Sequence, residues 1–169
     1  MEVLEAILKR RSIRQYTDRP ISDDVIETLL KAAMYAPSAV NKQPWHYIVF
    51  RDCEMMEKII LLHQNASMLR QADVAILVCW DEELQHDTGY GPVDCSAATQ
   101  NILLAAYGLG LGSVWIGLYP RIQRMESVHA LFALPQNIRP FSIVSLGYPA
   151  EDKKMPLRFN RDRIHFEKW

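Results

Sequence analysis

Apolar residues recur along the chain with two different periods, which predict helices alternating with strands. Helical spacing covers residues 3–8, 22–35, 54–62, 93–108 and 121–132, each with an apolar stripe. Strand-like runs cover residues 46–51, 73–80, 114–117 and 141–146. The second of these runs is apolar throughout and flanked by charge, so we expect a central strand that is covered on both faces.

Most of the predicted strands are joined through helices, and the chain contains no internal repeat or linker. This order predicts one α+β domain over residues 1–169, with three layers, about six helices and four strands. A four-stranded sheet has exposed edges. The charged tail, residues 150–169, carries Phe159, Phe166 and Trp169, and a merely disordered tail would seldom hold so many aromatic side chains. We therefore expect this tail to dock, either on its own domain or on a neighbouring chain.

Composition places the chain among ordinary globular proteins. Hydrophobic residues make up 49%, charged residues 23%, and the formal net charge is −1, which argues against general nucleic-acid binding. The three cysteines form no CxxC pair, so neither a disulfide framework nor a zinc site is indicated. The start of the chain lacks a basic region followed by an apolar run, and no apolar stretch approaches membrane-spanning length. We expect a cytoplasmic protein without a membrane partner.

The loop between the second helix and the first strand carries unusual polar groups. Pro37 and Pro44 fix its two ends and remove backbone donors. Between them, Ser38, Asn41 and Gln43 offer hydroxyl and amide groups beside free backbone N–H groups. The loop suits a flat polar ligand, but a well-satisfied connection between helix and strand explains the same residues.

A basic cluster, residues 9–14, follows the first helix. Cations at a helix C-terminus are favourable by about 0.3–1 kcal/mol, which explains Lys9, Arg10 and Arg11. That explanation does not extend to Arg14. Four cations within six residues repel one another unless water or an anion surrounds them, and a phosphate is the natural anion.

Two features of the predicted helix over residues 93–108 bear on function. The glycines of residues 108–113 superficially resemble a dinucleotide-binding loop, but they follow a helix and precede a strand, which is the reverse order, so we interpret them as a helix C-cap. Thr99, Gln100 and Asn101 are more polar than a monomer core requires, and a close subunit contact would explain them.

Isolated titratable residues indicate no further chemistry. The five histidines are scattered and are interpreted as surface or capping residues: His46, His63, His86, His129 and His165. Nothing resembles a catalytic triad, so no side chain is expected to act as a nucleophile. We expect no metal site.

Four stretches together resemble the flavin-dependent nitroreductase family. They are residues 10–16 (RRSIRQY), 36–45 (APSAVNKQPW), 108–119 (GLGLGSVWIGLY) and 146–149 (LGYP). Each is weak alone, but they occur in the family's order within a similarity that runs from about residue 7 to residue 163. The resemblance implies an α+β, three-layer fold with a mostly antiparallel central sheet of four to five strands flanked by helices. It also implies an interlocked homodimer, with non-covalent FMN at the interface and the tail docked on the partner subunit.

By the same resemblance, side chains from both ends of the chain would hold the cofactor. The FMN phosphate would meet Arg10, Arg11, Ser12, Arg161 and Arg163. Arg14 would lie nearer the flavin ring, beside N1 and O2, where a cation favours the reduced form.

Two further sets of residues would enclose the ring. From the other subunit, Pro37, Ser38 and Ala39 would line one side, while Asn41 and Gln43 would hydrogen-bond to its polar edge or to the ribityl chain. The other set is Trp115, Ile116 and Gly117, with a backbone N–H pointing towards N5.

The implied function is an FMN-dependent oxidoreductase. NADH or NADPH would give hydride to flavin N5, and a small organic acceptor such as a nitroaromatic or a quinone would then take it in a ping-pong sequence. The alternatives are a flavin-binding dimer that acts as an FMN store or sensor, and a specialised relative such as a reductive dehalogenase or a flavin-cleaving enzyme.

The chain also departs from the family pattern. It lacks the acidic residue that larger relatives carry near Ile116, and Ser67 falls near a position where relatives often have lysine. The segment that roofs the substrate pocket would be missing or reduced to residues 82–92, so an open, permissive pocket is expected.

Overall fold

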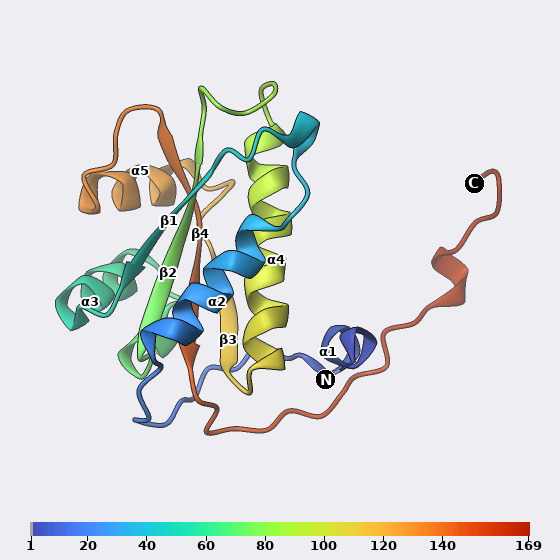
Figure 1. Ribbon diagram of the computed structural model, residues 1–169, viewed down its shortest axis with the longest axis horizontal. Coiled ribbons are helices and arrows are strands. Elements are labelled where there is room, and N and C mark those ends of the chain that lie inside the picture. Colours follow the sequence, from blue (N-terminus) through green and yellow to red (C-terminus); the bar gives the residue numbers. More distant parts are fainter. Residues whose placement is uncertain (1) are drawn as a thin grey trace.

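The computed structural model describes residues 2–169 and is built on a four-stranded sheet with the strand order β1-β2-β4-β3 (Figure 1). The strands are β1 (Trp45–Phe50), β2 (Val74–Asp81), β3 (Gly112–Gly117) and β4 (Ile138–Gly147). Every ladder is antiparallel, although a helix lies between each strand and the next in sequence. The α+β class and the antiparallel sheet are confirmed.

Helices cover both faces of this sheet and complete three layers. The helices are α1 (Val3–Lys9), α2 (Asp23–Met34), α3 (Cys53–Leu62), α4 (Tyr90–Gly108) and α5 (Ile122–Leu131). One face packs on α2 and α4, and the other on α3 and α5 (Figure 1). Along β2 the side chains alternate between these two cores, and every residue is buried. This confirms the expected central strand, since an apolar run without alternation requires cover on both faces.

Several predicted boundaries and one count are wrong. Residues 2–169 contain five α-helices and three short 3-10 helices, not six helices. Helix α4 begins at Tyr90 instead of residue 93, because Gly89 (φ 98°) turns the chain and Gly91 packs directly on Trp80. Strand β4 begins at Ile138, before Pro140, and the ladder accommodates the missing N–H with a register shift opposite Val78 and Cys79.

Glycine ends α4 as the sequence predicts. Gly110 has φ 77°, and its N–H donates to Tyr107 O (3.0 Å), while Leu111 N–H donates to Ala106 O (2.8 Å). These two bonds and the left-handed residue form a Schellman motif. The glycine stretch is therefore a helix C-cap that leads into β3.

The polar residues in the middle of α4 have partners inside the chain. Thr99 Oγ1 lies 3.1 Å from Ser142 Oγ, and Asn101 Nδ2 donates to Ala32 O (2.9 Å). The polarity of Thr99 and Asn101 is therefore explained within the chain, because the sheet and α2 provide their partners, and the expected subunit contact stays a prediction.

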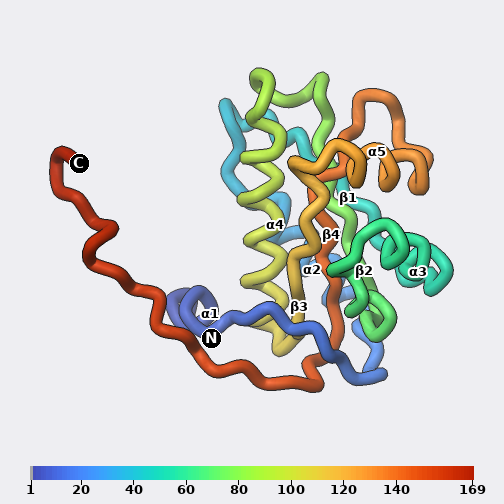
Figure 2. The backbone as a smooth tube through the Cα atoms, turned by 180° about the vertical axis from the view of Figure 1, so that it is seen from behind, coloured from blue at the N-terminus to red at the C-terminus, as the bar shows by residue number. Residues whose placement is uncertain are grey.

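The C-terminal tail lies against the segment after α1 over residues 150–154, and the rest of it leaves the body of the molecule (Figures 1 and 2). It contains one short turn, Arg161–Arg163. From residue 154 onward its residues are exposed, with Leu157 97%, Phe159 80% and Trp169 100% accessible. Docking on its own domain, one of the two predicted arrangements, is observed for the start of the tail, where Ala150 N–H donates to Gln15 O (2.9 Å), and not for its remainder. Among residues 2–169, no helix is both long enough and apolar enough to cross a membrane.

Candidate functional site

The basic segment after α1 is held along the edge strand β3 by its apolar members. Ile13 N–H donates to Ser113 O (3.0 Å), and the buried Tyr16 hydroxyl lies 2.7 Å from Ser145 Oγ. Two glycines make room for these anchors, since a Cβ on Gly112 would lie 2.7 Å from Ile13 Cγ2, and one on Gly147 would lie 2.6 Å from Tyr16 Cγ. The sequence RRSIRQY thus fixes its Ile and Tyr to the sheet and leaves the arginines on the outer side.

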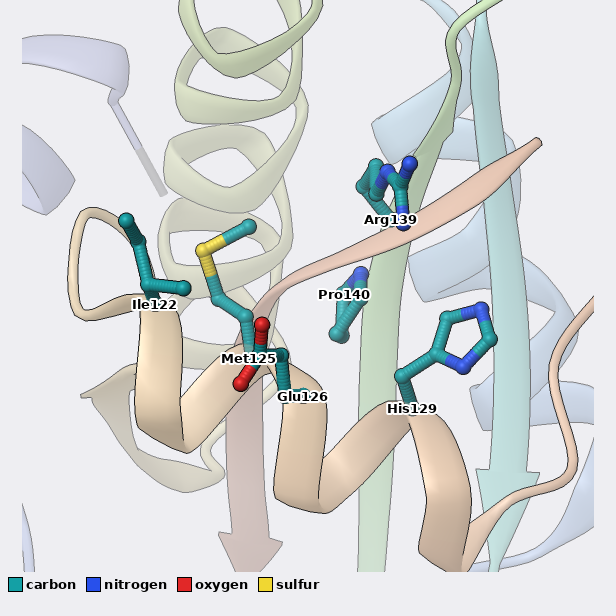
Figure 3. A pocket seen from close by; sticks show the side chains of 6 residues that line it. All are labelled: Ile122, Met125, Glu126, His129, Arg139 and Pro140. Carbon is teal, nitrogen blue, oxygen red and sulfur yellow. The ribbon is translucent and has the colours of Figure 1, made fainter. Parts of the chain in front are cut away.

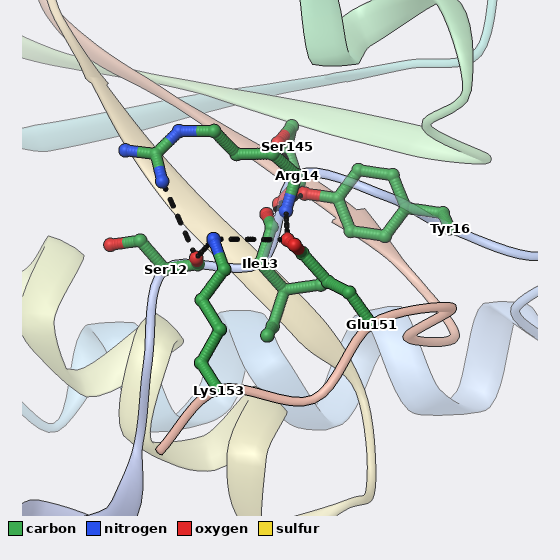
Figure 4. A network of polar contacts seen from close by, with 7 residues as sticks. All are labelled: Ser12, Ile13, Arg14, Tyr16, Ser145, Glu151 and Lys153. Atoms are coloured by element: carbon green, nitrogen blue, oxygen red, sulfur yellow. Dashed lines mark hydrogen bonds and ion pairs between the residues drawn. The ribbon is translucent and has the colours of Figure 1, made fainter. Parts of the chain in front are cut away.

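The beginning of the tail clamps this segment from outside (Figure 4). Glu151 Oε1 accepts the N–H of Arg14, and Lys153 Nζ donates to Ser12 O (2.8 Å) and pairs with Glu151 Oε1 (3.1 Å). Burial alone would raise the pKa of the Glu151 carboxyl, but the Arg14 N–H and the Lys153 ammonium together hold this pKa below its usual value. An ionised Glu151 is therefore part of the scaffold that positions Ser12 and Arg14.

Arg10 is charged, half-buried and without an acceptor. Its Nε is fully covered and has no hydrogen-bond partner in residues 2–169. Burial, then the neighbouring cations Arg11 and Arg158, lower the pKa of its guanidinium. Arg11 differs, because its guanidinium donates to Leu8 O (2.8 Å) and to Arg10 O, which caps α1. Arg10 thus carries a charge that the chain does not pair, and a phosphate would neutralise it.

Arg14 shares one cavity with the three residues expected beside the ring. This cavity has a volume of about 460 Å³, and its lining includes Arg14, Trp115, Ile116 and Gly117. Trp115 also packs edge-to-face on Phe141, with 5.4 Å between ring centroids, so it belongs to both the core and the cavity wall. The structure therefore brings together, at the edge strand β3, four residues that the sequence placed in two separate motifs.

The same cavity contains two residues that sequence reasoning missed, His63 and Asn65. His63 is only 5% exposed. Its Nδ1 accepts the N–H of Asn65 (3.2 Å), so Nε2 carries the proton and donates to Gly117 O (3.0 Å). Its predicted capping position at the end of α3 is correct, but a surface location is wrong. No sequence signal marks it, because the partner is a backbone carbonyl far along the chain.

The polar loop before β1 is strained. Val40, Asn41 and Gln43 have φ values of 50°, 56° and 50°, and this left-handed region is rare for a β-branched residue such as Val40. Two bonds hold the loop: Gln43 N–H donates to Ser38 Oγ (2.9 Å), and the Ala39 N–H donates to a carboxylate of α4 (3.0 Å). Strain of this kind costs about 1–3 kcal/mol and concentrates at functional sites. It favours the ligand-binding interpretation of the loop over a plain connection.

A single chain does not bring all of the expected site residues together. The strained loop, with the 3-10 helix Ala39–Asn41, lies at the opposite end of α4 from α1 and the basic segment (Figure 1). The C-terminal part of the tail, which contains Arg161 and Arg163, lies away from the body of the molecule (Figure 2). Together with Arg158, these two arginines line a hollow of their own. Pro37 lies at the start of the strained loop and is therefore also distant from the basic segment.

A second cavity, between α5 and β4, contains none of the expected site residues (Figure 3). Its volume is about 350 Å³, and its lining includes Glu126, His129 and Arg139. Arg139 pairs with Glu82 (2.9 Å), so the cationic group here is already neutralised.

Comparison with known proteins assigns the fold and the motifs to one family. The model of the nitroreductase family matches residues 7–63 and 60–148. The chain belongs to the nitroreductase family. It is 52% identical, over 100% of its length and 88% of the relative's, to a protein of Methanothermobacter thermautotrophicus named provisionally as an NADH dehydrogenase/NAD(P)H nitroreductase.

Solved structures of this family have the same fold. A provisionally named NADH dehydrogenase/NAD(P)H nitroreductase of Parabacteroides distasonis superposes with a TM-score of 0.94 at 37% identity, over 99% of this chain and 98% of that one. A provisionally named nitroreductase of Desulfovibrio desulfuricans, solved in complex with FMN, gives a TM-score of 0.87 at 32% identity, over 100% of this chain and 98% of that one.

Proposed function

We propose that this nitroreductase-family protein is an NAD(P)H-dependent FMN oxidoreductase that reduces a small organic acceptor such as a nitroaromatic or a quinone. The observation that carries the proposal is the pair Arg10 and Arg14. Arg10 holds a half-buried charge without an acceptor, and Arg14 lines the cavity beside Trp115 and Gly117. The names of the relatives, and the FMN bound by one of them, support the same cofactor.

The residues present fit FMN. Arg10 and Ser12 would hold the phosphate, since a charge-assisted hydrogen bond contributes about 1.5–3 kcal/mol. Arg14 would lie at the ring edge, where its charge favours electron-rich flavin. When bound, FMN supplies the redox chemistry, taking hydride from NADH or NADPH at N5 and passing it to the acceptor in a second step. His63 would fix the backbone at Gly117 through its bond to that carbonyl.

We further propose a homodimer in which each flavin lies between two chains. The loop of Pro37, Ser38, Ala39, Asn41 and Gln43 would come from the partner. Exposed apolar side chains on α1, with Val3 72% and Leu4 71% accessible, and on the tail, support an extensive contact. The tail, residues 150–169, would dock on the partner and bring Arg161 and Arg163 to the phosphate, so that residues 1–169 form one interlocked domain. A cytoplasmic location remains a prediction from the sequence.

Absorption spectroscopy tests the function. The purified protein is expected to be yellow, to bleach under anaerobic NADH or NADPH, and to recover its colour when a nitroaromatic or a quinone is added. A yellow protein that neither nicotinamide bleaches contradicts the reductase and supports the flavin store or sensor. A colourless protein that does not bind added FMN contradicts both.

A further inference from the structure

The cavity that contains Arg14 continues to the start of α5, and three arginines are among its lining residues. Arg14, His63, Arg121 and Arg124 line it, and none of its lining residues is acidic. No carboxylate of residues 2–169 lies within 4.0 Å of the Arg121 or Arg124 guanidinium, whereas the other arginine beside α5, Arg139, is paired with a glutamate. Arg121 and Arg124 therefore hold positive charge in a concave site that the chain itself does not neutralise.

The position of these two arginines on α5 is unfavourable for the helix. Arg121 is the N-cap residue, Arg124 lies in the first turn, and this turn contains no acidic residue. Positive side chains are repelled by the positive N-terminal end of the helix dipole and are favourable at the other end. Helix stability thus does not explain why two cations stand here.

Where Arg124 meets His63, two hydrogen-bond donors face each other and neither nitrogen atom can act as the acceptor. Arg124 NH1 lies 3.2 Å from His63 Nε2. The Nδ1 atom of His63 already accepts a backbone N–H, so Nε2 is itself a donor, directed to Gly117 O. The guanidinium therefore faces another N–H, and its own donors require an oxygen that residues 2–169 do not provide at that point.

We propose that Arg121 and Arg124 bind an oxyanion, a phosphate or a carboxylate, of the substrate that lies in this cavity against the flavin. The inference rests on the proposed function and extends it to substrate class. Arg14 would serve the ring itself, while the pair on α5 would select substrates that carry negative charge at a distance from the reacting atom. The anion has two possible sources, a phosphate of the nicotinamide donor or a carboxylate on the acceptor.

Arg121→Gln/Arg124→Gln tests the proposal, with Arg139→Gln as the matched control for loss of one guanidinium beside α5. Titration calorimetry of NADP⁺ and of para-nitrobenzoate into the oxidised, flavin-loaded protein measures anion binding without turnover. Anaerobic stopped-flow reduction compares NADPH with 1-benzyl-1,4-dihydronicotinamide, which has no phosphate. Reoxidation compares para-nitrobenzoate with its neutral amide.

For one of the two anions, we expect the binding affinity and the reaction rate to fall by about 10-fold for each guanidinium removed. The rates with the neutral probes, and all values for the Arg139→Gln control, should not change. Loss confined to NADP⁺ and NADPH identifies the phosphate, and loss confined to para-nitrobenzoate identifies the carboxylate. Unchanged binding of both anions, or equal losses with the neutral probes, overturns the proposal. A wild-type flavin that neither NADPH nor the benzyl compound reduces contradicts the proposed function instead, while the calorimetry still decides the anion site.

Discussion

Replacing Arg10 with methionine should move cofactor affinity and protein stability in opposite directions. The methionine keeps an unbranched stem but removes the charge and all five donors. In the flavin-free protein, the Arg10 Nε is covered and has no partner, and burial with the neighbouring Arg11 and Arg158 already lowers the pKa of the group. A buried unsatisfied donor costs about 1–3 kcal/mol. Because Arg10 is only half-buried, we expect the free energy of unfolding of the flavin-free protein to rise by about 1 kcal/mol.

The same substitution removes a charge-assisted bond to the phosphate, which contributes about 1.5–3 kcal/mol. The Kd for FMN should therefore rise on the order of 10-fold to 100-fold. Flavin fluorescence titration measures the Kd, and urea unfolding of the flavin-free protein measures stability. Arg70→Met is the control, because Arg70 forms a bidentate pair with Glu57 on the surface. A flavin-free R10M protein that is less stable, with unchanged FMN affinity, refutes the phosphate role and makes Arg10 a structural residue.

Three further predictions concern the scaffold of the site. Gly147→Ala should lower the free energy of unfolding, measured by urea denaturation, by about 1–3 kcal/mol, because the new Cβ would overlap Tyr16. The control Gly108→Ala should be neutral or stabilising, because no atom lies within 4 Å of its new Cβ. Equal effects of the two substitutions contradict the packing argument. Val40→Asn should raise the free energy of unfolding by about 1 kcal/mol, because asparagine tolerates the left-handed backbone and the Val40 side chain, 70% exposed, contributes little packing. An unchanged midpoint of urea denaturation contradicts the argument from backbone strain. Glu151→Gln should destabilise the protein by about 1 kcal/mol at neutral pH. Because the folded-state pKa of Glu151 is lowered, its contribution to stability is complete above the usual pKa of 4.5 and is lost as the pH falls through the folded-state pKa. The free energies of unfolding of wild type and E151Q should therefore become equal in acid. A difference that does not change with pH contradicts the argument.

Local patterns predicted the fold because local chemistry decides those elements. The apolar run of residues 73–80 requires cover on both faces, and β2 has it. The glycine that follows α4 takes the left-handed position that favours glycine. Pro140 misled the prediction of β4, since the ladder absorbs it with an irregularity that depends on the partner strand. The sequence also does not predict the partners of Thr99 and Asn101 in α4, because these partners, Ser142 and Ala32, are distant in sequence.

The candidate site was predictable where a motif is contiguous and not where it depends on tertiary contacts. Arg14 stands out as an unexplained charge within the basic cluster of the sequence, and in the structure it lines the cavity, while the covered Nε of Arg10 has no partner in residues 2–169. His63 and Asn65 carry no comparable signal, since only the approach of α3 to the end of β3 brings them to the cavity. The sequence predicts only the helix that contains Arg121 and Arg124, since the cavity that they share with Arg14 is formed by tertiary contacts.

The central claim is that two clusters far apart in one chain are two halves of one flavin site. FMN binding by mixed dimers tests it most directly. One variant is Arg10→Met; the other is Asn41→Gly/Gln43→Gly, which removes two amides while glycine keeps the positive φ values. Each alone should bind FMN poorly, at an FMN concentration chosen between the wild-type and variant Kd values. After unfolding and refolding together, about a quarter of the sites should be wild type by random pairing of chains, and binding should recover to that level. If the mixture binds no more FMN than the two variants do separately, the site does not lie between two chains.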